Sequence, residues 1–86
     1  MVPTMVCMIE IDEGNELFLK KKFQKAIEKY DLVLDKEPDN LIALNNKGYS
    51  LSKLKKYLEA LSYYDEFLEK NPADKAVLIN KISLFR

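Results

Sequence analysis

The chain has 86 residues, with 14 lysine and arginine residues against 14 aspartate and glutamate residues, so its formal net charge is zero. One small domain without a charge excess is a poor candidate for nucleic-acid binding through phosphate neutralisation. Histidine is absent, Cys7 is the only cysteine and only two glycines are present. The composition therefore lacks the commonest general base, a disulfide, a cysteine-based zinc site and a glycine-rich phosphate loop, and we expect no enzyme activity, no cofactor and no metal.

The first eleven residues are largely apolar, but they carry no basic leader and no small-residue cleavage motif, and Glu10, Asp12 and Glu13 follow closely. This pattern disfavours a secretory signal. No apolar run approaches the roughly 20 residues that span a bilayer. We expect a cytoplasmic protein without membrane contact, in which Cys7 is a small buried residue rather than a nucleophile, because no histidine can activate it.

Helical periodicity predicts five helices, at about residues 5–20, 23–36, 41–54, 57–70 and 74–86. In the second and fourth segments, apolar residues recur as on the buried face of an amphipathic helix; they are Ala26, Ile27, Tyr30, Val33 and Leu34, then Leu61, Tyr64, Phe67 and Leu68. Pro38 and Pro72 mark the turns that follow. Asn40 and Asp74 are placed to cap the next helices.

The sequence repeats itself after 34 residues. Thirteen of the 34 positions from Gly14 to Lys47 carry the same residue 34 positions later, including the glycine, one alanine, one tyrosine and the proline of each unit. A repeat of this length indicates stacked helical hairpins in a solenoid, in which each unit buries its apolar face against the next.

The repeated residues resemble the pattern of the tetratricopeptide repeat (TPR), a helix-turn-helix unit. The matches are Gly14, Leu17, Phe23, Ala26, Tyr30 and Pro38 in the first unit, and Leu44, Gly48, Leu51, Tyr57, Ala60, Tyr64 and Pro72 in the second. Glu10, Glu13 and Lys47 depart from the pattern, because the family usually has apolar residues there. The resemblance implies an all-α, TPR-type helical-hairpin solenoid of five helices, with two full repeats plus one terminal helix. The chain would be a single TPR domain, 1–86, with repeat one at 7–40, repeat two at 41–74 and a partial third repeat or capping helix at 75–86.

By resemblance, such a domain is a scaffold for protein–protein interaction, which holds a peptide or a helix of a partner in a groove lined by the first helix of each repeat. The family's groove positions correspond here to Met8, Ile11, Asn15, Phe18, Ile42, Asn45, Asn46, Tyr49, Lys53 and Ile79. For Phe18 and Tyr49, ligand contact and core packing stay open as alternatives. For Asn15 and Asn46 we favour hydrogen bonds on the helix surface or between helices.

The segment 14–40 also resembles the first repeat of co-chaperone TPR domains, which grip the C-terminal carboxylate of heat-shock proteins with two asparagines and three basic residues. Asn15 and Asn46 match the asparagines, but Ile11, Ala76 and Asn80 stand where the resemblance implies cations. The main charge-assisted donors are therefore missing. We expect no tight carboxylate clamp, and titration with an acidic C-terminal chaperone peptide tests this.

Charge is distributed unevenly along the chain. Residues 1–46 carry nine acids and six bases, while residues 47–86 carry five acids and eight bases, so the halves have net charges of −3 and +3. The lysine runs at 20–22 and 53–56 fall at predicted turns, where we interpret them as solvated rather than as a nucleic-acid site.

The last predicted helix is apolar on most sides, although a terminal solenoid helix needs a polar outer face. Its candidate self-association residues are Leu78, Ile82, Leu84 and Phe85. Either a longer repeat array covers this surface, or a second copy of the chain does. The alternative function is therefore a self-assembling structural or regulatory module, a homo-oligomer formed through the C-terminal helix.

Overall fold

A computed structural model describes residues 3–86, so the first two residues of the predicted domain lie outside the described part. The helices are α1 (Pro3–Leu19), α2 (Phe23–Lys36), α3 (Leu41–Lys53), α4 (Tyr57–Lys70) and α5 (Lys75–Ser83), and no strand occurs among the described residues. The all-α prediction of five helices is confirmed. The predicted bounds are met for α2 and α4, whereas α5 ends at Ser83 and the last three residues form a turn.

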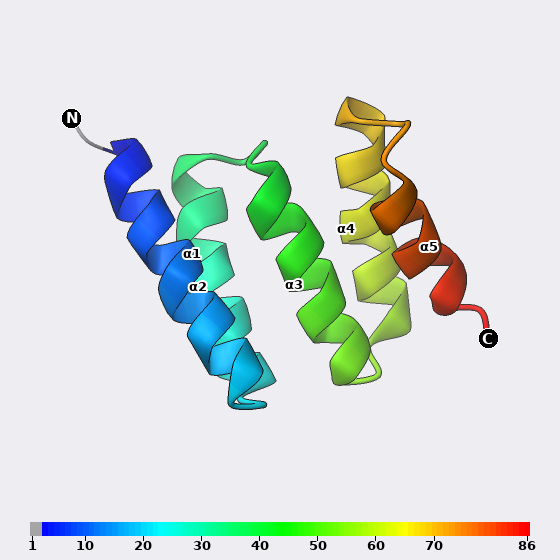
Figure 1. Cartoon of the computed structure of the whole chain (residues 1–86), viewed down its shortest axis with the longest axis horizontal. Helices are drawn as coiled ribbons and strands as arrows, with labels where there is room; N and C mark the ends of the chain where they lie inside the picture. Colours follow the sequence, from blue (N-terminus) through cyan, green and yellow to red (C-terminus); the bar gives the residue numbers. More distant parts are fainter. Residues whose placement is uncertain (1–2) are drawn as a thin grey trace.

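The helices form two layers (Figure 1). Figure 1 shows α1, α3 and α5 in the nearer layer and α2 and α4 behind them. The closest packing is between helices that follow one another, first α1 on α2 and α3 on α4, then α2 on α3 and α4 on α5. This is the arrangement of stacked helical hairpins, with overall dimensions of 41 × 28 × 17 Å. None of the described helices combines the length and the apolarity that a membrane span requires.

Equivalent turns in the two repeats share their caps and their backbone conformation. The side chains of Asn40 and Asp74 each accept a hydrogen bond of 3.0 Å from the backbone N–H three residues later, which confirms both predicted caps. At the other end of each hairpin, Lys21 and Lys55 adopt the same left-handed conformation, with φ of 63°. That conformation is unfavourable for a residue with a side chain, so both turns store strain at equivalent lysines.

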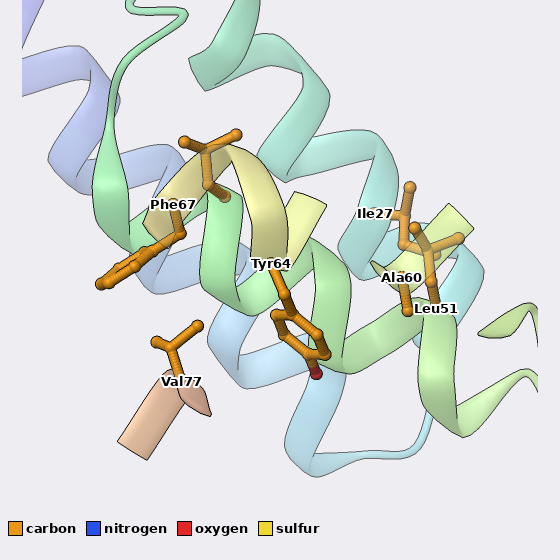
Figure 2. Close-up of a cluster of buried hydrophobic side chains, with 7 residues drawn as sticks. Ile27, Leu51, Ala60, Tyr64, Phe67 and Val77 are labelled. Atoms are coloured by element: carbon orange, nitrogen blue, oxygen red, sulfur yellow. The ribbon is translucent and has the colours of Figure 1, made fainter. Parts of the chain in front are cut away.

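Two apolar clusters form the core, and each joins a hairpin to the helices beside it. The first contains Cys7, Ile11, Ala26, Tyr30, Val33 and Ala43. The second, shown in Figure 2, joins α2, α3, α4 and α5 through Ile27, Leu44, Leu51, Ala60, Tyr64, Phe67 and Val77. Cys7 is buried, as predicted, and burial raises the pKa of its thiol.

Each glycine packs directly against the tyrosine of its own repeat. A Cβ atom added to Gly14 would lie 2.7 Å from Cε1 of Tyr30, and one added to Gly48 would lie 2.7 Å from Cε1 of Tyr64. Each ring therefore passes against the bare backbone of the first helix of its hairpin. This contact lets a tyrosine on the rear layer extend its hydroxyl toward the front layer.

The charged departures from the family pattern in α1 have partners on α2. Glu10 pairs with Lys36 at 3.0 Å, and Glu13 pairs with Lys29 at 3.1 Å. Such exposed pairs contribute at most about 1 kcal/mol each. They show that these two positions of α1 face the basic side of α2 rather than an apolar neighbour.

Candidate functional site

Three neighbouring pockets lie among the front-layer helices. The α1/α3 pocket has a volume of about 270 Å³ and is lined by Asn15, Phe18, Leu19, Tyr30, Asn46 and Tyr49. The α3/α5 pocket, of about 330 Å³, is lined by Tyr49, Ser52, Lys53, Tyr57, Tyr64, Asn80, Ser83 and Leu84. The third, the hairpin-end pocket of about 400 Å³, is lined by Phe18, Leu19, Lys21, Phe23, Tyr49 and Lys53. Tyr49 lines all three pockets and is therefore at the centre of this surface.

An aromatic cluster forms the wall between the pockets. The rings of Phe18 and Tyr49 stack with centroids 5.2 Å apart, and Phe18 meets Phe23 edge-on at 5.1 Å. The Lys53 ammonium lies 5.0 Å from the centroid of Tyr49, a cation–π contact. Tyr49 remains 40% exposed. The cluster thus offers a large apolar surface to solvent while its own contacts hold it in place.

In the first hairpin, the polar floor of the α1/α3 pocket is satisfied internally. Oδ1 of Asn15 accepts hydrogen bonds from the Tyr30 hydroxyl at 2.6 Å and from Nδ2 of Asn46 at 2.9 Å. The structure therefore confirms the inter-helix hydrogen bond favoured for the two asparagines. Burial raises the pKa of Tyr30 to about 12, and the Asn46 side chain opposes this rise.

The second hairpin lacks this network. Tyr49 occupies the position equivalent to Asn15, and its ring stacks on Phe18, so it offers no amide to the Tyr64 hydroxyl. The nearby Ser52 hydroxyl donates to the backbone oxygen of Tyr49 at 2.6 Å instead. Burial raises the pKa of Tyr64 to about 12, and hydrogen bonding to the Ser52 side chain opposes this rise. The partner of the Tyr64 hydroxyl is therefore another hydroxyl rather than an amide, and both residues line the α3/α5 pocket.

The pockets of the two layers differ in charge. The residues that line the three front pockets include Lys21 and Lys53 but no acid. By contrast, the hollows along α2 and α4 are lined by Lys47 and by five acids, which are Asp31, Asp35, Asp65, Glu66 and Glu69. The front pockets are therefore apolar and cationic, whereas the rear hollows are mainly acidic.

Lys47 lies in the rear hollow between α2 and α4 and is held there by its own partners. It donates hydrogen bonds to Asp31 and, at 2.7 Å, to the Tyr63 hydroxyl, and it lies 4.3 Å from the Tyr63 ring centroid. Burial lowers the pKa of Lys47, but these hydrogen bonds outweigh it and the net pKa is raised. The arrangement is a structural cross-link between α2, α3 and α4, and it leaves no free cation for a ligand.

The predicted groove residues divide into three groups. Asn15, Phe18, Asn46, Tyr49 and Lys53 line the front pockets. Met8, Ile42 and Ile79 are exposed on the front helices but line none of these pockets, and Asn45 accepts a hydrogen bond of 3.3 Å from Asn80. The prediction for Ile11 was wrong, because its side chain is only 7% exposed and belongs to the first core cluster.

The predicted self-association residues divide similarly. Leu78, Ile82 and Phe85 are exposed on or just after α5, with Phe85 the most open at 71%. Leu84, in the turn after Ser83, is half-buried and packs against the second core cluster, and its part in self-association stays a prediction.

Sequence reasoning missed the contribution of the rear-layer tyrosines. The periodicity assigns Tyr30 and Tyr64 only to the buried faces of their helices, but both line front-layer pockets. The signal was present in the repeat itself. Position 15 is asparagine in the first unit and its equivalent, position 49, is tyrosine, so the amide partner of one hydroxyl is missing in the second unit.

Comparisons with known proteins agree with this architecture. The family model of the tetratricopeptide repeat matches residues 42–74, which contain most of α3 and all of α4. The first hairpin shares its 34-residue spacing and its glycine–tyrosine contact. A comparison with curated proteins found no match. Repeats of this family generally mediate protein–protein interactions. The family match shows a tetratricopeptide repeat at residues 42–74, and the internal 34-residue repeat and the stacked hairpins extend the same all-α helical-hairpin architecture to the first unit.

Proposed function

We propose that the chain is a scaffold that binds a peptide or a helix of a partner protein across the front layer. The observation that carries the proposal is the Phe18–Tyr49 stack, a half-open aromatic wall shared by three adjacent pockets. Aromatic residues beside apolar pockets are the usual anchors of protein interfaces. Met8, Ile42 and Ile79 are exposed on the same three helices and extend the apolar surface beyond the pockets.

The internal hydrogen bonds of the α1/α3 pocket favour an apolar anchor there. Both acceptor positions of the Asn15 amide oxygen are already used, so the pocket floor has little left to offer a polar ligand group. The pocket volume, about 270 Å³, suits one large side chain rather than a whole small molecule. An aliphatic or aromatic ligand residue suits this pocket best, because the transfer of apolar surface out of water lowers the free energy.

Affinity capture with a double variant tests this proposal. Phe18→Ala with Tyr49→Ala removes the aromatic wall and should abolish capture of the partner from native lysate, because it removes the anchor surface. Leu58→Ala is the matched control, since Leu58 is exposed on α4 in the rear layer. Capture by the double variant at the level of Leu58→Ala, with circular dichroism unchanged, would contradict the proposal.

Self-assembly is a second candidate function, favoured by the exposed apolar side chains of Leu78, Ile82 and Phe85. A second copy could cover them, and the opposite net charges of the two halves favour a head-to-tail contact. Sedimentation at tens of micromolar tests this: Ile82→Lys with Phe85→Lys should convert an oligomer to a monomer. A monodisperse 10.0 kDa species for the unmodified chain would contradict self-assembly. A cytoplasmic location stays a prediction from the sequence.

A further inference from the structure

The two hairpins differ in the hydrogen-bond partner of their buried tyrosine. In the first, the Tyr30 hydroxyl reaches the front layer and is bound by Asn15. In the second, the Tyr64 ring packs on Gly48 in the same way, but its hydroxyl meets no amide. Tyr64 is 1% exposed, so this donor is held rigidly by a buried ring. The Tyr64 hydroxyl has only the Ser52 hydroxyl as a side-chain partner, and a ligand carboxylate is a stronger acceptor than a serine hydroxyl.

We infer that the α3/α5 pocket binds an Asp or Glu side chain of the partner peptide, with the Tyr64 hydroxyl donating to its carboxylate and the Lys53 ammonium balancing its charge. This inference rests on the proposed peptide-binding function and adds the chemical class of one ligand residue. Both groups line the pocket, and Ser52, Ser83 and Asn80 complete a rim of polar side chains.

The charges of the pocket support a carboxylate over other acceptors. Lys53 is the only charged side chain among the residues that line the α3/α5 pocket, and no acid lines it. One ammonium matches a single negative charge, whereas a phosphate group is usually met by several arginines or a helix N-terminus. A neutral backbone carbonyl would leave the Lys53 ammonium with its cation–π contact to Tyr49 and no negative charge to balance it. The carboxylate is thus the acceptor that satisfies both donors.

The position of Tyr49 predicts how the recognised residues are spaced in the peptide. Tyr49 lines both the α1/α3 pocket and the α3/α5 pocket, so a ligand that fills both must pass its ring. An apolar residue in the first pocket and an acid in the second would then be close neighbours in the peptide. The expected ligand is a peptide in which an aliphatic or aromatic residue lies within a few positions of an Asp or Glu.

A peptide selection tests the inference. Two random twelve-residue libraries are displayed against the whole chain, one joined at its C-terminus to the carrier and one with a free C-terminus. Selection from the joined library should enrich an acid at a fixed short distance from an apolar residue. Replacing that acid by its amide, Asp by Asn or Glu by Gln, should weaken binding of the synthetic peptide about tenfold, as for loss of one hydrogen bond between charged and neutral groups.

Two tyrosine variants separate recognition from folding. Tyr64→Phe should weaken binding of the acidic peptide about tenfold and should lower thermal stability less than Tyr30→Phe, since the Tyr64 hydroxyl has only the Ser52 hydroxyl as a side-chain partner. Tyr30→Phe is the matched control: it removes the bond to Asn15, so it should lower stability but leave the acid preference intact. Lys53→Gln should reduce the salt dependence of binding, whereas Lys56→Gln, outside the lining of the pocket, should change it much less.

The outcomes separate this inference from the proposed function. If enriched peptides lack an acid, or if Tyr64→Phe binds as well as the unmodified chain while Tyr49→Ala does not bind, the carboxylate site is overturned and the groove remains. Enrichment only in the library with free C-termini would assign the pocket to a terminal carboxylate and would also overturn the inference. If neither library yields a specific peptide, both the inference and the proposed groove are wrong.

Discussion

At the scale of single residues, the contact between each glycine and its tyrosine positions the candidate site. The ring of Tyr64 needs the space that a Cβ of Gly48 would fill, because that atom would lie 2.7 Å from Cε1 and 2.9 Å from Cδ1. Tyr64 is 1% exposed, so its ring is packed closely by its neighbours. Close approach at the glycine therefore decides where the hydroxyl emerges in the front layer.

Gly48→Ala should destabilise the protein for this reason. Alanine alone would favour the helix by about 1 kcal/mol, but forcing a packed ring to shift costs about 1–3 kcal/mol, so we expect a net loss. Urea denaturation measures the free energy of unfolding. Ser62→Ala, at an exposed position of α4, is the control and should be neutral or slightly stabilising. A Gly48→Ala protein more stable than the unmodified chain would show that the ring does not lie there.

Lys55→Gly should stabilise the protein, in contrast to Gly48→Ala. Lys55 adopts φ of 63°, a conformation that costs a residue with a Cβ about 1–2 kcal/mol. Glycine avoids this strain but loses more entropy on folding, so we expect a net gain of about 0.5–1 kcal/mol. Lys56→Gly, where φ is −93°, should destabilise. Thermal unfolding followed by circular dichroism compares the two, and an equal loss in both would contradict the turn geometry.

At the scale of helices, the N-cap of α5 affects the α3/α5 pocket, because α5 forms one end of that pocket. Asp74 begins α5 by accepting from the backbone N–H of Val77, and α5 supplies Asn80 and Ser83 to the α3/α5 pocket. With nine residues, α5 is the shortest helix and packs mainly on α4. The end of the pocket therefore depends on a helix that is too short to be stable without its neighbours.

Asp74→Ala should loosen α5 before the rest of the protein. Loss of a side-chain cap costs about 1 kcal/mol, and the cost falls on the least supported helix. Amide hydrogen exchange should speed up in α5 while α2 and α3 change little. Asn40→Ala is the matched control, because it removes the equivalent cap of α3. Equal exchange changes across all helices in the Asp74→Ala protein would contradict this local effect.

The sequence predicted the helices well and the side-chain directions less well. Periodicity and the 34-residue repeat located all five helices, because both reflect the buried faces and the turns directly. They could not reveal that Ile11 faces the core or that Leu84 turns onto the second cluster, since both depend on how neighbouring helices are rotated and where α5 stops. The loss of an amide partner for Tyr64 is visible in the repeat, where Tyr49 replaces Asn15, but the pocket that Tyr64 lines required the structure.

At the scale of the molecule, the two buried tyrosines couple folding to alkaline pH. Burial raises the pKa of both Tyr30 and Tyr64 to about 12, whereas an unfolded tyrosine ionises near pH ~10. A folded pKa above the unfolded value means that the stabilisation is complete below pH ~10 and is lost as the pH rises toward ~12. Both hairpins contain such a tyrosine, so they should lose stability in the same range.

The chain should therefore unfold cooperatively between about pH 10 and pH 12. Tyrosinate absorbance and helical circular dichroism should change together for the part of the signal that comes from Tyr30 and Tyr64. Tyr64→Phe should shift the transition upward in pH, because one of the two groups that must ionise is gone. Complete ionisation of all tyrosines with the helices intact would contradict the burial of these two side chains.

The pockets of the two layers also differ in charge. Acids predominate in the rear hollows, while the charged residues that line the front pockets are lysines beside an aromatic wall. A ligand with apolar and acidic side chains should be attracted to the front and repelled by the rear. The central claim is therefore that binding takes place on one layer only.

Amide chemical-shift mapping with a selected peptide tests this claim most directly. We predict that the largest shifts fall on the front layer, at Asn15, Phe18, Tyr49, Lys53 and Asn80, and that they disappear in the protein carrying Phe18→Ala and Tyr49→Ala. The exposed rear-layer residues Leu58 and Glu69 should stay unchanged. Shifts concentrated on α2 and α4, or shifts that persist without the aromatic wall, would contradict the account.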